Sequence, residues 1–135
     1  MPTQVLINID VDDLARAIAF YRDALGLRIG RRFGMNGVEM LGANAPIYLL
    51  DKASGSLGAA AQPRFYGRHW TPVHLDFAVD DLEETLARAL AAGARQDGEI
   101  RRAVWGHLVT CADPFGHGFC LIQFQGRGYN EIADS

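Results

Sequence analysis

The stretch Val11–Leu27 reads VDDLARAIAFYRDALGL, and its opening tetrapeptide VDDL returns 68 residues later at Val79–Leu82. The residues just before the two copies also correspond, because LINID at 6–10 and HLDFA at 74–78 both alternate apolar and polar side chains. Alternation with a period of two is typical of a β-strand, and self-similarity over half a chain indicates a duplicated unit. We therefore expect two modules that are built in the same way.

After each VDDL tetrapeptide the apolar spacing becomes helical, and Gly26 and Gly93 are natural helix stops. Asp12 and Asp80 are expected to cap the helices, since a short carboxylate accepts hydrogen bonds from the free amides of a first turn. Glu83 would complete a capping box with Asp80. The stripes expected to face the core are Leu14, Ile18, Tyr21 and Leu25 in the first helix and Leu82, Leu86 and Ala89 in the second.

Each helix is followed by three strand-like segments. They are expected at 27–33, 38–41 and 46–50 in the first half and at 94–100, 107–111 and 119–124 in the second. Asp113-Pro114-Phe115-Gly116 has turn residues at the positions where a type I turn prefers them, so it should join the last two strands. The order β-α-β-β-β thus occurs twice and predicts an α+β fold. We expect a single domain over 1–135, with module one at 1–51, a loop at 52–72 and module two at 73–135.

The composition limits the kinds of partner. The 135 residues are 49% hydrophobic and carry a net charge of −3 at pH 7, so a nucleic-acid partner is not expected. No apolar run approaches the length of a membrane-spanning helix, and the N-terminal residues lack a signal-peptide pattern, which predicts a cytoplasmic protein without a membrane partner. Cys111 and Cys120 flank the expected turn, and we interpret them as buried thiols rather than a disulfide.

The loop at 52–72 carries four ring side chains, Phe65, Tyr66, His69 and Trp70. A loop of this length inside a compact domain is often a lid or a binding segment. Two interpretations stay open at this point. The rings cover a cleft or a dimer partner, or they pack onto the edge of the domain.

These residues resemble a known family. VDDLARAIAFYRDALGL, the later HLDFAVDDLEETLARALAAGA and the closing ADPFGHGFCLIQF are similar to segments of the vicinal oxygen chelate superfamily, which contains glyoxalases, bleomycin-resistance proteins and extradiol dioxygenases. The resemblance covers nearly the whole chain. It implies tandem βαβββ modules that form a concave mixed sheet, and it implies a homodimer. It does not define a reaction, because one fold hosts many functions.

In metal-dependent members of that superfamily, four cleft positions hold a divalent cation. The resemblance places Leu6, Tyr48, His74 and Cys120 at those positions. Leucine cannot ligate a cation, and a phenol or a thiol does so only after losing its proton. We therefore predict a site with no metal and no other cofactor.

The remaining polar residues of the expected cleft predict a small-molecule site. The ligand-binding candidates are Asn8, Tyr48, His74, Asp76, Trp105 and Cys120. The first hypothesis is a protein that binds or sequesters a small organic molecule, such as a drug or metabolite of aromatic or cationic character. The alternative is an enzyme of lyase, isomerase or dioxygenase type. It would use His74 as its catalytic acid–base group or as a ligand of a divalent metal.

Overall fold

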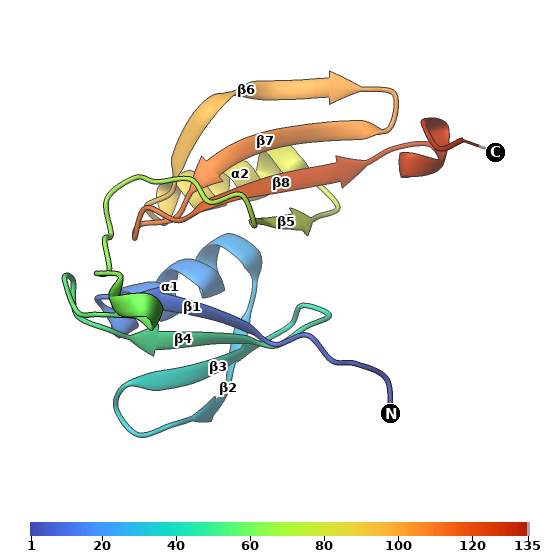
Figure 1. The fold of residues 1–135 in the computed structure, drawn as a ribbon. Helices are drawn as coiled ribbons and strands as arrows, with labels where there is room; N and C mark the ends of the chain where they lie inside the picture. The colour runs from blue at the N-terminus through green and yellow to red at the C-terminus, as the bar shows by residue number, and fades with distance from the viewer. Residues whose placement is uncertain (135) are drawn as a thin grey trace. The chain divides into compact units, whose positions relative to one another are not determined.

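The computed structural model describes residues 1–134, which form two compact units, Met1–Gly67 and the residues from Arg68 onward. Each unit is one βαβββ module with a helix and a mixed four-stranded sheet (Figure 1). The strand order is β1-β4-β3-β2 in the first sheet and β5-β8-β7-β6 in the second. The predicted α+β class and the repeated β-α-β-β-β order are therefore confirmed.

The first unit contains β1 (Ile7–Val11), α1 (Leu14–Leu25), β2 (Arg28–Arg32), β3 (Gly37–Leu41) and β4 (Ile47–Asp51). β1 pairs with β4 in parallel, and the other neighbours are antiparallel. The strands after the helix agree with the predicted segments to within one residue at each end. A 3-10 helix, η1 (Ala59–Ala61), follows in the connecting segment.

The second unit contains β5 (Leu75–Ala78), α2 (Leu82–Ala91), β6 (Arg95–Ala103), β7 (Gly106–Ala112), β8 (Gly118–Phe124) and the 3-10 helix η2 (Gly128–Glu131). β6 continues three residues beyond its predicted end. A register shift lies between Asp97 and Arg101, where Gly98 takes a φ of 88°. Such a bulge bends the strand and re-aims the side chains that follow it, so Arg101 pairs directly with Leu108 of β7.

The buried stripe of α1 differs from the predicted one. Ala17, Phe20, Tyr21 and Ala24 are buried, whereas Leu14, Ile18 and Leu25 are only half-buried. The two alanines are the reason, since small side chains allow the helix backbone to approach the sheet while larger residues flank the contact. Five residues on the facing strands are fully buried, namely Val11, Val38, Met40, Ile47 and Leu49. In α2 the predicted Leu82, Leu86 and Ala89 are buried.

The predicted helix caps are wrong by one residue. Asp13 caps α1 and Asp81 caps α2, and their carboxylates accept the N–H groups of Arg16 and Glu84. Asp12 and Asp80 precede the caps, so Glu83 is not the capping-box residue. Both helices begin at the leucine of VDDL, and the residue directly before this first helical position has the extended backbone that lets its side chain reach back.

The predicted turn between β7 and β8 is confirmed. The Asp113 carboxylate accepts hydrogen bonds from the backbone N–H groups of Phe115 and His117, and the N–H of Gly116 donates to the Asp113 carbonyl. Gly116 has a φ of 82°, which glycine adopts without strain. The turn sets the antiparallel register of the hairpin that carries Thr110 and Cys120.

The connecting segment makes contacts within both units. Arg64 forms an ion pair of 2.8 Å with Asp10, and the Tyr66 hydroxyl donates to the carbonyl of Lys52 in the first unit. His69 lies 3.1 Å from a ring nitrogen of His117 in the second unit. These contacts favour the packing interpretation of this segment. Within residues 1–134, none of the helices combines the length and apolar character needed to cross a membrane.

Gly106 provides a test of the hairpin. Its φ is 150°, and a Cβ added there would lie 2.2 Å from the carbonyl oxygen of Gln123 on the neighbouring strand. We expect Gly106→Ala to lower the free energy of unfolding by roughly 3 kcal/mol or more, because the added methyl group forces two paired backbones apart. Urea unfolding monitored by circular dichroism measures the change.

Gly98→Ala is the matched control. Gly98 also has a positive φ, but an added Cβ would meet no atom within 4 Å. We expect it to cost about 1–2 kcal/mol, the penalty for a left-handed backbone alone. Equal losses in the two variants would show that the close approach of β7 and β8 is not what requires Gly106.

Candidate ligand-binding site

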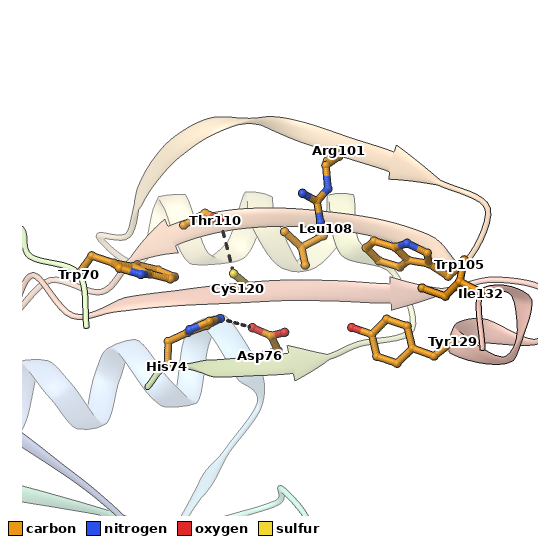
Figure 2. Close-up of a pocket in the computed structure, with 10 residues that line it drawn as sticks. All are labelled: Trp70, His74, Asp76, Arg101, Trp105, Leu108, Thr110, Cys120, Tyr129 and Ile132. Atoms are coloured by element: carbon orange, nitrogen blue, oxygen red, sulfur yellow. Dashed lines mark hydrogen bonds and ion pairs between the residues drawn. The ribbon is translucent and has the colours of Figure 1, made fainter. Parts of the chain in front are cut away.

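A pocket of about 490 Å³ lies on the sheet of the second unit. Figure 2 shows its side chains in front of the sheet and α2 behind it, so the pocket occupies the face that the helix leaves uncovered. The volume suits a small organic molecule. The lining residues are Trp70, His74, Asp76, Arg101, Trp105, Leu108, Thr110, Cys120, Tyr129 and Ile132.

The register of three strands determines which residues lie at the centre of this site. Asp76 of β5 is aligned with Cys120 of β8, and Cys120 is aligned with Thr110 of β7. Residues directly opposite one another across a sheet project from the same face. The neighbouring Val109 and Leu121 are fully buried on the opposite face, toward α2. The alternation of side chains along these strands thus places core residues on one face of the sheet and site residues on the other.

His74 and Asp76 interact at one end of the pocket. The Nε2 atom of His74 lies 3.3 Å from a carboxylate oxygen of Asp76. The ring of Trp70 packs against the imidazole at a centroid distance of 4.5 Å. The pair is open to solvent, so it is able to exchange a proton or a hydrogen bond with a bound molecule.

Cys120 lies beside this pair but is poorly suited to act as a nucleophile. Its side chain is 4% exposed, and its sulfur lies 3.5 Å from the hydroxyl of Thr110. Burial raises the pKa of the Cys120 thiol, and burial raises the pKa of Cys111 to about 12. Both cysteines are free and buried, which confirms the interpretation of the sequence. A protonated thiol is a weak nucleophile.

The other end of the pocket is aromatic and carries a cation. The guanidinium of Arg101 lies over the ring of Trp105 at 5.8 Å, and Tyr129 packs against the same indole at 5.6 Å. Trp105 is only 9% exposed, so it supports these two side chains more than it presents an open surface. Ile132 adds a further apolar side chain at this end.

Sequence reasoning did not assign five of the lining residues to a site, namely Arg101, Leu108, Thr110, Tyr129 and Ile132. Arg101 belongs to an adjacent basic pair of the kind found on solvated strand edges. Tyr129 and Ile132 lie beyond the last predicted strand, at η2. The alternation of β7 was a usable signal for Leu108 and Thr110, whereas nothing in the local sequence indicates that the C-terminal segment returns to the sheet.

Asn8 and Tyr48, the other two candidates, lie in the first unit. They are aligned across β1 and β4, and Tyr48 is aligned with Glu39 of β3. The Tyr48 hydroxyl donates to a Glu39 carboxylate oxygen at 3.3 Å, and Arg31 contacts the same oxygen at 2.7 Å. Hydrogen bonds from Arg31 lower the pKa of Glu39 to about 2. A ligand-binding role for Asn8 and Tyr48 stays a prediction.

The site positions of the second module have counterparts in the first module. Asn8 and Tyr48 pair in the first module as Asp76 and Cys120 pair in the second. Leu6 stands two residues before Asn8, as His74 stands two residues before Asp76. At two of these three pairs of positions, the second module has a titratable side chain, His74 or Asp76, where the first module has Leu6 or Asn8.

A divalent cation, which metal-dependent relatives hold, would find a partial set of ligands here. One potential donor atom from each of His74, Asp76 and Cys120 lies within 4.8 Å of the others. Imidazole, carboxylate and thiolate all ligate zinc, so the donor types fit. Cys120 must first lose a proton that burial helps it to retain. The four metal-ligand positions inferred from the family resemblance include His74 and Cys120 but not Asp76.

Two βαβββ modules, each with a mixed four-stranded sheet, define the class of α+β fold, and a pocket of ligand size lies on the second sheet. The family model described as a glyoxalase-like domain matches residues 6–122. The chain therefore belongs to the glyoxalase-like domain family, which confirms the resemblance predicted from the sequence.

Relatives and solved structures agree with this assignment. The uncharacterized protein Mb0911c of Mycobacterium bovis is 33% identical over 120 residues, which cover 84% of this chain and 78% of that protein. The fosfomycin resistance protein FosX of Listeria monocytogenes superposes with a TM-score of 0.72 at 20% identity, covering 98% of this chain and 99% of FosX. Lactoylglutathione lyase of Agrobacterium tumefaciens superposes with a TM-score of 0.61 at 23% identity, covering 93% of this chain and 100% of the lyase chain.

Thiol labelling tests the assignment of the cysteines. We expect neither Cys111 nor Cys120 of the folded protein to react with Ellman's reagent at the rate of glutathione at roughly pH 8, because burial keeps both thiols protonated and covered. Both should react once the protein is unfolded in guanidinium. One fast equivalent that disappears in Cys120→Ser would identify a reactive thiol and contradict this assignment.

Proposed function

We propose that this protein binds a small organic molecule in the pocket on β5–β8 and that binding does not require a metal ion. The observation that carries the proposal is the composition of the pocket. Apolar and aromatic side chains surround a few polar groups, chiefly the His74–Asp76 pair and Arg101. Small-molecule sites have this composition, with apolar walls for affinity and a few polar groups for orientation.

The ligand set supports binding without a metal. The first module offers Leu6 and Tyr48 at the positions where metal-dependent relatives have ligands, and the hydroxyl of Tyr48 is already hydrogen-bonded to Glu39. In the second module the Cys120 thiol is held in its protonated form. Sequestration of a drug or metabolite in the cytoplasm, by a homodimer of this chain, is the form of this function that we favour.

A second candidate function follows from His74, Asp76 and Cys120. A FosX structure was solved with Mn(II) and 1S,2S-dihydroxypropylphosphonic acid, so a protein of this fold holds a metal ion and a small phosphonic acid together. In this chain the three clustered donors would hold an ion, which would act as a Lewis acid when bound. Without an ion, His74 would serve as the acid–base group of an enzyme, oriented by Asp76.

A thermal-shift screen of antibiotics and aromatic metabolites tests the binding function. A compound present at about 100 times its Kd should stabilise the protein by about 2.7 kcal/mol. We expect His74→Ala to reduce the shift of any hit, because His74 forms one wall of the pocket. Glu84→Ala, on the exposed face of α2, should leave the shift unchanged. A hit that protects both variants equally would place its binding outside this pocket.

Metal analysis distinguishes the two candidates. We expect purified protein to contain far less than one equivalent of zinc, nickel, manganese or iron. Calorimetric titration with zinc should give at most weak binding, because Cys120 must be deprotonated first. A stoichiometric ion that is lost in both His74→Ala and Asp76→Asn, and retained in Glu84→Ala, would favour the metal-dependent enzyme instead.

A further inference from the structure

Arg101 is the positive group of the pocket that has no carboxylate partner. Within residues 1–134 no Asp or Glu forms an ion pair with it, although most other arginines of the second unit have one. The only acidic lining residue, Asp76, is engaged by His74. The pocket therefore contains a carboxylate in contact with an imidazole at one end and a guanidinium without a carboxylate partner at the other.

The position of Arg101 leaves its hydrogen-bond donors available. The guanidinium carbon lies 5.8 Å from the centroid of the Trp105 ring. Contact with an aromatic face engages the π surface of a guanidinium, whereas its N–H groups point outward in the plane. A planar carboxylate accepts two such N–H groups at once. Figure 2 shows Arg101 extending from β6 toward Leu108, so the donors lie on the pocket side of the strand.

Exposed apolar side chains line the same pocket as this cation. Tyr129 and Ile132 line the pocket, yet they are 49% and 57% exposed. In Figure 2 they lie with Trp105 at the same end of the pocket, and the hydroxyl of Tyr129 points toward the side of Asp76. A ring placed against Tyr129, Ile132 and Leu108 would remove apolar surface from water while its acidic group meets Arg101.

In the first module, an arginine on the corresponding sheet has a carboxylate partner within the module. There Arg31 contacts Glu39, which is aligned with Tyr48. The residue aligned with Cys120 in the second module is Thr110, which has no charge. The carboxylate that neutralises the cation of module one is thus missing from the corresponding position of module two.

We propose that the pocket selects small aromatic acids, with Arg101 as the receptor for the carboxylate or another planar anion and with Tyr129, Leu108 and Ile132 as the contact surface for the ring. This proposal rests on the proposed binding function and specifies its ligand. It keeps the aromatic character that the sequence predicts for the ligand and replaces the cationic alternative with an acid. The preference for an acid depends on the direct contact with Arg101 and not on the net charge of the chain.

The test compares three probes that share one ring system: 2-naphthoate, the neutral 2-naphthamide and the cationic 2-naphthylmethylammonium. Calorimetry or the fluorescence of Trp70 and Trp105 measures their affinities. We expect 2-naphthoate to bind at least about tenfold more tightly than the amide, with the ammonium compound weakest, since a hydrogen-bonded charge pair is stronger than a neutral contact. Arg101→Met should bring the affinities for the acid and the amide to within about threefold of each other.

Leu108 allows a matched pair of variants, because it is aligned with Arg101 across β6 and β7. Leu108→Glu places a carboxylate opposite the guanidinium and should abolish the preference for the acid. Leu108→Gln has nearly the same shape as Leu108→Glu and no charge. It should weaken the contact with the ring in the same way, and so lower the affinity for both probes, but retain the preference for the acid over the amide. Loss of the preference in both variants would overturn the role of Arg101.

The outcomes separate this inference from the function on which it rests. If the three probes bind with equal affinity and His74→Ala weakens all of them, the pocket binds aromatic compounds and only the preference for acids is wrong. If none of the probes binds at millimolar concentration, both the ligand class and this pocket as the binding site are overturned. A preference for the acid that persists in Arg101→Met would likewise exclude Arg101 as the receptor.

Discussion

The pairing of β5, β8 and β7 is the constraint on which the site depends. Because Asp76, Cys120 and Thr110 are aligned across three strands, their side chains share one face, and the fully buried Val109 and Leu121 take the other. A shift of one residue in this register would move the core residues to solvent and the polar residues under α2. The burial of the core side chains stabilises this register and therefore also holds the pocket residues in place.

The two modules use the same framework differently. In the first, Glu39, Arg31 and Tyr48 satisfy one another, and Gly30 leaves the space that Glu39 occupies, since an added Cβ would lie 2.5 Å from its carboxylate oxygen. In the second, Thr110 and the bulge in β6 leave Arg101 without an internal partner. Within residues 1–134, the duplicated fold thus pairs Arg31 with a carboxylate in the first module and leaves Arg101 without one in the second.

The sequence predicted the fold better than the site. Strands, helices and the turn at Asp113–Gly116 depend on local periodicity and on turn residues, so they were readable along the chain. The errors at the helix caps and in the buried stripe of α1 were small. Both features depend on where the helix begins and how it lies on the sheet, which the local sequence does not define. Four of the six ligand-binding candidates lie in one pocket, namely His74, Asp76, Trp105 and Cys120. Strand alternation indicated the shared face of His74, Asp76 and Cys120, whereas the family resemblance suggested Trp105.

By itself, the sequence determined that the chain has two βαβββ modules and that each strand has a core face and an outer face. Only the tertiary structure decided which distant residues meet on that outer face. Arg101 reaches the pocket through a bulge, and Tyr129 and Ile132 reach it through η2, which follows the last strand. These contacts are non-local, and cross-strand register and packing, rather than the pattern of neighbouring residues, determine them.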